Sequence, residues 1–265
     1  MNQGSQRMRR AFTMMELLVV IGIIAVLLGI LFPVVSKLRK SAYGASTGQT
    51  INTLTAAINA YQAVFQAYPG PFDFSRPAGT RYTIGTSPAF TSGGTPIQPT
   101  SSESLVLGLS GGVNVVIGTG GSITTFEYVS SKVGNGPVSL NGQRPRQYQV
   151  FVDAGSKLTD PSDVADTATD TIVPEFVDSF PEPKPILYVR ANRGASGTAA
   201  QYDASLFGYG LTFPTAEFTA AQYYGDPSFN NLEPRQKDQF ILISAGADGK
   251  YGTKDDITNF GSPGH

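Results

Sequence analysis

The hydrophobic pattern divides the chain into an apolar N-terminal stretch and a longer mixed region. From Leu17 to Val35 the sequence runs for 19 residues without a charged side chain. At the α-helical rise of 1.5 Å per residue, this run covers about 28 Å, close to the ~30 Å hydrocarbon core of a bilayer. A helix that is apolar on every face is seldom the core helix of a soluble protein. We therefore expect residues 12–35 to form a membrane-spanning helix.

The helical pattern continues beyond this run. Apolar residues recur at alternating steps of three and four, which marks one face of a helix: Ile51, Leu54, Ile58, Tyr61, Phe65 and Tyr68. The proline in Tyr68-Pro69-Gly70 cannot continue the helix and disfavours helical geometry at the residue before it. The pattern predicts a stem helix over residues 36–68, whose apolar face docks on the protein's own head. Pro33 lacks a backbone N–H and is expected to kink or locally unwind the helix.

The remaining region, residues 69–265, has the composition of a head with many turns. Between Pro69 and Arg146, 22 of the 78 residues are glycine or proline, which indicates loops and short elements. One helix is expected to begin near Ser101 and to continue through Leu109. Strands are predicted at 124–129, 147–153, 186–190 and 239–244, with a weaker candidate at 207–213. The set predicts an α+β fold, in which the long N-terminal helix packs on a small antiparallel sheet.

Composition argues against several kinds of active site. The chain has no cysteine, so disulfides and cysteine-based zinc or thiol sites are excluded. The one histidine is His265, which argues against a multi-histidine metal centre and a Ser-His-Asp triad. Without a nucleophile–base arrangement, we do not expect an enzyme. Charged residues make up 15% of the chain and the formal net charge is −1, which argues against a basic nucleic-acid-binding surface.

Two further stretches have a biased composition. The glycine-rich stretch from Gly108 to Gly121 lacks the third glycine and the following helix of a dinucleotide-binding loop, so nucleotide binding is not expected. The segment from Asp153 to Glu182 contains eight acidic residues and one base, Lys157, and is predicted to be a solvated loop.

The carboxylate of Glu16 does not fit a plain membrane anchor. It stands at the edge of the apolar run, and a charge within a membrane span costs about 2.5–3.5 kcal/mol at the centre and less near an end. No cation of the same helix is placed to neutralise it within the bilayer. Glu16 is therefore expected to have a partner, and its helix offers no suitable cation.

The residues around Glu16 resemble a known processing signal. Arg9-Arg10-Ala11-Phe12-Thr13-Met14-Met15-Glu16-Leu17-Leu18-Val19-Val20 is similar to the type IV prepilin signal, read in that family as G|FTLIELLVV. The resemblance implies that prepilin peptidase removes a leader, residues 1–11, by cutting after Ala11, and that the new first residue, Phe12, is N-methylated. Glu16 and Pro33 match positions of the family pattern, whereas Ala11 stands where the family usually has glycine. The resemblance also implies that Glu16 neutralises the N-terminal amine of a neighbouring subunit, because the two charges are desolvated more cheaply together than apart.

The C-terminal loop, residues 244–257, offers the strongest candidate chemistry. An apolar strand leads into a turn at Asp248-Gly249, followed by Gly252 and the paired acids Asp255 and Asp256. Three carboxylates on a glycine-bent backbone can supply oxygen ligands for calcium. From the residues alone, a calcium site and a hairpin turn with solvated acids both stay open.

This loop also resembles the C-terminal loop of the major pseudopilin of type II secretion, an SAGxDGxxGTxDDI-like stretch. The resemblance implies a structural Ca²⁺ ion held by Asp248 and Asp255, with Asp256 as a further ligand. Backbone carbonyls near Ala245 and Thr253 would complete the shell. The ion would order the loop and would take no part in a reaction.

Together these features predict a non-enzymatic filament subunit that resembles the pseudopilins of type II secretion, although the resemblance does not extend over residues 71–238. It implies a single-pass protein of the cytoplasmic membrane, with residues 1–11 in the cytoplasm and the head on the periplasmic side. Expected partners are membrane lipid, further copies of the chain, other pseudopilins, prepilin peptidase and the inner-membrane assembly platform; nucleic acid is not expected. The alternatives are a type IV pilin, major or minor, for adhesion, motility or DNA uptake, and a membrane-anchored binding module that never polymerises.

Overall fold

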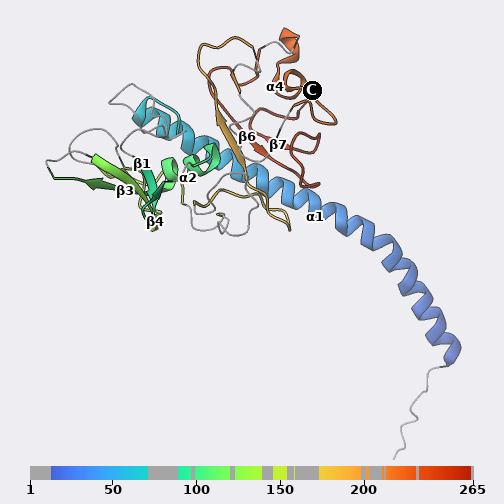
Figure 1. Cartoon of the computed structure of the whole chain (residues 1–265). Coiled ribbons are helices and arrows are strands. Elements are labelled where there is room, and N and C mark those ends of the chain that lie inside the picture. The colour runs from blue at the N-terminus through green and yellow to red at the C-terminus, as the bar shows by residue number, and fades with distance from the viewer. Residues whose placement is uncertain are drawn as a thin grey trace, which may run out of the picture. The chain divides into compact units, whose positions relative to one another are not determined.

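The computed structural model describes residues 13–70, 89–96, 99–119, 123–138, 146–153, 158, 173–197, 201–202, 211, 213–230 and 233–263. The chain divides into two compact units, Met1–Ala42 and Tyr43–His265. In chain order, the elements labelled in Figure 1 and the shorter ones between them are α1 (Met14–Phe65), β1 (Ala89–Ser92), β2 (Thr95–Pro96), α2 (Ser101–Ser110), β3 (Gly111–Ile117), β4 (Ile123–Val133), β5 (Leu187–Arg190), α4 (Ala220–Tyr224), the 3-10 helix η3 (Pro227–Phe229), β6 (Phe240–Ser244) and β7 (Ile257–Thr258).

The N-terminal half of α1 belongs to the first unit and confirms the helix that the apolar run predicts. The helix continues without a break through Pro33, so the expected local unwinding does not occur. The Ser36 hydroxyl donates a hydrogen bond to the carbonyl oxygen of Pro33, 2.9 Å away.

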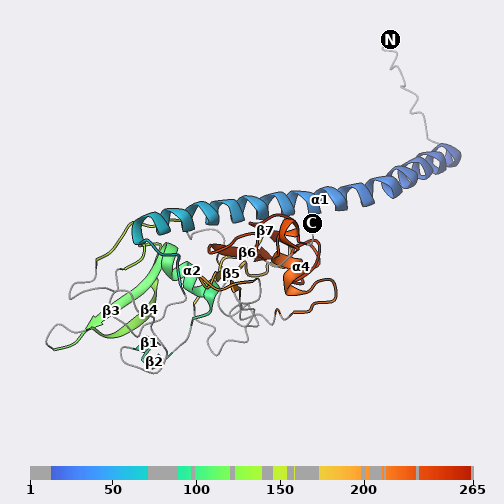
Figure 2. The ribbon, with the colours of Figure 1, turned by 90° about the horizontal axis from the view of Figure 1, so that it is seen from above.

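In the second unit, the C-terminal half of α1 is held by its apolar face. Ile51, Leu54 and Ile58 are each at most 1% exposed, and Tyr61 is partly covered. They pack in one core cluster with α2, β5 and β6, whose buried members include Leu105, Val106, Leu109, Tyr188, Phe240 and Leu242. The predicted docking of the stem on the head is confirmed. In Figure 2 this half of α1 runs above both sheets.

Polar contacts fix the same helix near its entry into the second unit. The backbone N–H of Ser179 donates to the Thr47 hydroxyl (3.1 Å), and the hydroxyls of Ser46 and Ser179 lie 2.9 Å apart. The ring centroid of Tyr43 lies 6.1 Å from that of Phe180. The chain segment before β5 therefore anchors the stem helix where the apolar stripe has not yet begun.

The three-stranded sheet, in the order β5-β6-β7, separates two core layers. All its pairings are antiparallel, and side chains along β5 and β6 alternate between the faces. The face toward α1 carries Tyr188, Phe240 and Leu242. The opposite face joins an aromatic-rich cluster, whose buried members include Leu187, Val189, Ile241, Ile243, Tyr202, Phe218, Tyr223, Tyr224 and Phe260.

The second sheet has four strands in the order β2-β1-β4-β3. Strand β1 runs parallel to β4, and the other two pairs are antiparallel. Helix α2 lies between the two sheets and contacts both β3 and β5, as both views show (Figures 1 and 2). A capping box starts this helix: the Thr100 hydroxyl accepts from the Glu103 backbone N–H at 3.1 Å, and the Glu103 carboxylate accepts from the Thr100 N–H. The helix predicted near Ser101 is confirmed.

The α+β class is confirmed, and the small antiparallel sheet on which the stem helix packs is β5-β6-β7. The head also contains a second, mixed sheet that was not predicted. The strands predicted at 124–129, 186–190 and 239–244 are confirmed as β4, β5 and β6. Residues 147–153 form no strand, only an isolated bridge between Gln147 and Val138. Most of the weaker candidate at 207–213 lies outside the described residues.

Strand β3 went unpredicted because glycines surround it. Its valines and Ile117 have the β-branched character of a strand, but Gly111 and Gly112 at its start made the stretch resemble a loop. Pairing with β4, from Gly111–Val133 to Ile117–Ile123, supplies the order that the local sequence does not.

The C-terminal end of the acidic segment is buried, contrary to the prediction of a solvated loop. Glu175 and Asp178 are 2% and 3% exposed. The Asp178 carboxylate accepts hydrogen bonds from the backbone N–H of Lys184 (3.1 Å) and from the Ser244 hydroxyl (3.0 Å). Burial raises the pKa of the Asp178 carboxyl, and these hydrogen bonds oppose the shift.

Ile58→Ala should lower the free energy of unfolding of the full chain by about 2–5 kcal/mol, because truncation of a fully buried side chain leaves a cavity between stem and head. Val64→Ala on the same helix is the matched control, since Val64 is 50% exposed. Denaturant titrations of both variants in detergent micelles measure the two losses. Equal losses would contradict the docking of this helix face on the head.

Candidate assembly helix and C-terminal acidic loop

The N-terminal half of α1 has an exposed apolar surface. Its most apolar window of 18 residues has a mean hydropathy of 3.1, and 0% of that window is buried. Within the described ranges, α1 is the one helix long and apolar enough to cross a membrane. Large apolar side chains that are more than half exposed include Met14, Leu18, Ile21, Val26, Ile30 and Phe32. These features indicate membrane anchoring through a single N-terminal helix.

Glu16 closes a capping box at the start of this helix. Its Oε2 accepts hydrogen bonds from the backbone N–H of Thr13 (2.9 Å) and from the Thr13 hydroxyl (2.8 Å). The Thr13 hydroxyl in turn accepts from the backbone N–H of Glu16 at 3.2 Å. Such a box satisfies N–H groups that have no partner within the first helical turn. Sequence reasoning missed this role of Thr13, although a threonine three residues before a glutamate is its signal.

The other predicted residues of the N-terminal segment are not gathered into one site. Ala11 and Phe12 lie outside the described residues. Pro33 lies several turns along α1 from Glu16, so the two residues act at different levels of the same helix.

The C-terminal acidic loop, residues 244–257, joins two antiparallel neighbours. Strands β6 and β7 pair at Ile243–Thr258 and Ser244–Ile257, so the loop is that of a hairpin. Gly246 is required at its start: its φ is +65°, and a Cβ there would lie 2.2 Å from the carbonyl oxygen of Asp255. The two ends of the loop are therefore in direct backbone contact.

Asp255 organises the first turn of this loop. Its Oδ2 accepts hydrogen bonds from the backbone N–H groups of Ala247 (2.8 Å) and Asp248 (2.9 Å), and its Oδ1 accepts from the Thr253 hydroxyl (2.7 Å). The Asp248 carboxylate accepts from the backbone N–H of Lys250 at 2.8 Å. Asp248 and Asp255 are both exposed, so their carboxylates lie at the outer face of the loop.

Asp256 turns inward instead and is only 6% exposed. Its Oδ2 accepts hydrogen bonds from the Tyr223 hydroxyl and from the backbone N–H of Gly252, the latter at 2.7 Å. Burial removes hydration from the charged form and raises the pKa of the Asp256 carboxyl to about 7, whereas the hydrogen bonds offset only part of that shift.

The three predicted calcium ligands therefore do not share one face of the loop. Within the ranges that the structure describes, no group of three or more acidic or histidine side chains could hold a metal ion. Asp256 is committed to Tyr223 and Gly252, so a calcium shell would draw its carboxylates from Asp248 and Asp255, whose oxygens suit this ion. Calcium binding at the loop stays a prediction.

Residues far away in sequence hold the loop in place, and sequence reasoning missed them. The Thr215 hydroxyl donates to the carbonyl oxygen of Gly252 (2.9 Å), and the Glu217 carboxylate accepts from the Lys254 N–H (2.8 Å). Tyr223, on α4, supplies the hydroxyl that meets Asp256. No local pattern marks these partners, because they meet the loop only through the tertiary fold.

The comparisons with known proteins bear on the N-terminal segment alone. Residues 6–32 match the family model described as the prokaryotic N-terminal methylation motif. Comparisons with curated proteins and with solved structures each found no match. The matched range contains Ala11, Phe12, Thr13 and Glu16, so it supports the resemblance from which the processing prediction comes. The head lies outside it.

Asp256→Asn should flatten the pH dependence of stability. The folded pKa of about 7 lies above the unfolded value near 3.8, so the stabilising contribution of this carboxyl is full below about pH 4 and is lost as the pH rises to about 7. Over that window, the folded state binds up to one more proton than the unfolded state, a slope of up to about 1.4 kcal/mol per pH unit.

Thermal melts of the wild type and of the Asp256→Asn variant between about pH 5 and about pH 8 measure this difference. Asp248→Asn, which alters an exposed carboxylate of the same loop, is the control. Parallel stability curves for the wild type and Asp256→Asn would show that the buried carboxyl does not titrate in this range.

Proposed function

We propose that this chain is a structural subunit of a type IV pilin-like filament, and more narrowly a pseudopilin of the type II secretion kind. The observation that carries the proposal is an exposed apolar helix whose first turn contains Glu16 and lies inside the matched methylation motif. An apolar surface of this size requires lipid or other apolar helices around it. A filament subunit meets both in turn: its helix lies first in the bilayer and then against the helices of neighbouring subunits.

The geometry at Glu16 leaves room for a partner from another subunit. The hydrogen bonds from Thr13 both reach Oε2, and Oε1 accepts none from the described residues. After cleavage behind Ala11, the new amine of Phe12 on a neighbouring subunit is a cation that can bond to this free oxygen. A charge-assisted bond of this kind is stronger than a neutral one and is favoured where water is excluded.

The proposed partners follow from this role. Prepilin peptidase would remove residues 1–11 and methylate Phe12, and an inner-membrane assembly platform would draw subunits from the bilayer. The proposed orientation places residues 1–11 in the cytoplasm and the head on the periplasmic side. The protein would act by assembly and would catalyse no reaction.

The C-terminal acidic loop favours a secretion pseudopilin over a true pilin, because residues 244–257 resemble the pseudopilin loop and the chain has no cysteines to bracket a pilin-type C-terminal loop. A type IV pilin for adhesion, motility or DNA uptake is the second candidate, since it has the same N-terminal motif. A membrane-anchored module that never polymerises is the third.

Glu16→Ala should leave membrane insertion intact and abolish filament assembly, because it removes the carboxylate that would meet the neighbouring amine. Thr13→Ala is the matched control: it removes the hydroxyl of the capping box but keeps the carboxylate, and should still assemble. Membrane fractionation followed by electron microscopy of sheared filaments measures both steps. Normal filaments from Glu16→Ala would overturn the proposed role.

The same preparations distinguish the third candidate. The intact mass of the membrane-extracted protein should correspond to a chain that begins at a methylated Phe12. A mass that retains residues 1–11, together with a monomeric protein, would favour the non-polymerising module.

Ca²⁺ should raise the melting temperature of the wild type, because an ion that binds only the folded loop stabilises the folded state by mass action. The melting temperature of Asp248→Ala should rise much less. At a concentration of about one hundred times Kd, the gain is about 2.7 kcal/mol. Glu182→Ala, an exposed acid outside the loop, should respond like the wild type. A melting temperature unchanged by calcium would remove the ion from the proposed function.

A further inference from the structure

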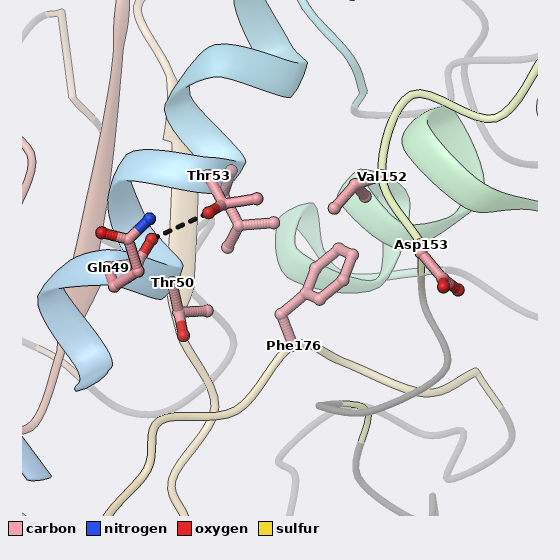
Figure 3. Close-up of a pocket in the computed structure, with 7 residues that line it drawn as sticks. Gln49, Thr50, Thr53, Val152, Asp153 and Phe176 are labelled. Carbon is pink, nitrogen blue, oxygen red and sulfur yellow. Dashed lines mark hydrogen bonds between the residues drawn. The ribbon is translucent and has the colours of Figure 1, made fainter.

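Two of the hollows formed by described residues border the stem helix in the second unit, and the first offers little to a ligand. It measures about 240 Å³ and is shown in Figure 3. Its threonines turn back on their own helix: the Thr53 hydroxyl donates to the carbonyl oxygen of Gln49 (2.9 Å), and the Thr50 hydroxyl donates to that of Ser46 (3.1 Å). Figure 3 shows Phe176 opposite these side chains.

The second hollow has a different lining. It measures about 280 Å³ and lies beside the C-terminal end of α1. We name it the arginine pocket after the side chains that dominate its chemistry; the residues used below are Gln62, Gln66, Tyr68, Arg190, Asn192 and Arg193. Two arginines and three residues with amide side chains thus line one small space. Every charged group in this lining is a cation.

No carboxylate of the residues that the structure describes neutralises these two positive charges. Arg190 donates one long hydrogen bond, 3.4 Å, to the carbonyl oxygen of Tyr68. Among the described residues, no carboxylate lies within 4.0 Å of Arg190 or Arg193. Asp238, which holds the turn after β5, is already used: it accepts from the Gly194 N–H and from the Gln201 side-chain amide, each at 3.0 Å.

The end of the helix cannot account for both charges. The carbonyls at a helix C-terminus are equivalent to about half a negative elementary charge, and the effect fades within the last turn. Arg190 donates to the carbonyl oxygen of Tyr68, which lies three residues beyond the end of α1 at Phe65 and is not one of the terminal carbonyls of the helix. Arg193 is exposed. Counted over the described residues, the arginine pocket therefore has a net positive charge, with residues that carry amide side chains beside it.

We propose that the arginine pocket binds a carboxylate group. A guanidinium presents parallel N–H donors that match the two oxygens of a carboxylate, and an arginine that is partly desolvated forms such a pair more strongly than one in open water. Gln62 and Asn192 can donate further hydrogen bonds to the same group, whereas the Gln66 side-chain amide already donates to the carbonyl oxygen of Ala63 at 3.0 Å. The carboxylate comes either from a small soluble dicarboxylate or from an acidic side chain of a second copy of this chain.

Malonate is the probe, because its two carboxylates match two arginines in number. Thermal melts of the full chain in detergent micelles, with EDTA present and chloride at equal ionic strength as the reference, should show a rise of a few degrees with malonate. Arg190→Gln and Arg193→Gln should each weaken the apparent affinity about tenfold or more, as expected for the loss of a charge-assisted hydrogen bond. Lys250→Gln, which removes a cation of the C-terminal acidic loop, should bind like the wild type.

Sedimentation of the same samples identifies the source of the carboxylate. If malonate binds and also disperses associated chains, the natural ligand is a second copy; if malonate binds and leaves association unchanged, the ligand is a small carboxylate. If malonate stabilises no more than chloride does, or if both arginine variants melt lower but respond to malonate like the wild type, the arginines only support the fold and the proposal fails. Because the pocket is separate from Glu16, that result would leave the proposed filament function untouched.

Discussion

The burial of the stem's apolar stripe is the contact on which the rest of the head depends. The side chains of Ile51, Leu54 and Ile58 are buried, and the burial of each stabilises the fold by about 1.5–3 kcal/mol. Tyr188 joins the surrounding parts at the centre of this contact. Its hydroxyl donates to the carbonyl oxygen of Pro69, just beyond the helix, and its backbone N–H donates to the Ser102 hydroxyl on α2, at 2.7 and 3.1 Å. One buried residue on β5 therefore contacts α2 and the segment that follows α1. Strand β6 pairs with β5 and leads into the C-terminal acidic loop.

The two halves of helix α1 differ in how their apolar side chains are covered. Its C-terminal half finds an apolar partner within the chain, whereas its N-terminal half exposes leucine, isoleucine and valine side chains along its length. Exposed apolar area of this extent is unfavourable in water, so that half belongs in lipid or among other helices. The capping box at Glu16 satisfies the backbone N–H groups of Thr13 and Glu16, and Oε1 of Glu16 accepts no hydrogen bond from the described residues. A helix that is uncovered along its sides is consistent with the proposed filament subunit.

The buried acids of the head show how far burial can change the meaning of a charged residue. The sequence predicts a solvated loop around Asp178 and a calcium ligand or a solvated acid at Asp256, yet both side chains are buried and accept hydrogen bonds from hydroxyl groups of distant segments. Asp255, next to Asp256, stays outside and shapes the loop backbone. Neighbouring residues of one type therefore take different roles because the β6–β7 hairpin turns one side chain toward α4 and the other toward solvent.

The parts of this protein that could be predicted from its sequence are those set by local periodicity and local chemistry. The apolar run, the stripe of the stem, the start of α2 and the hydrophobic strands β4, β5 and β6 each follow from residues that are close together in the sequence. The stem helix ends at Phe65, three residues before the predicted end at Tyr68. Other features could not be predicted in this way: the division into two sheets, strand β3, the burial of Asp256, and the pocket that Arg190 and Arg193 line together with Gln62 and Gln66. They depend on which distant segments pack together, and only the tertiary structure decides that, because burial and electrostatic partners arise from contacts that sequence spacing does not encode.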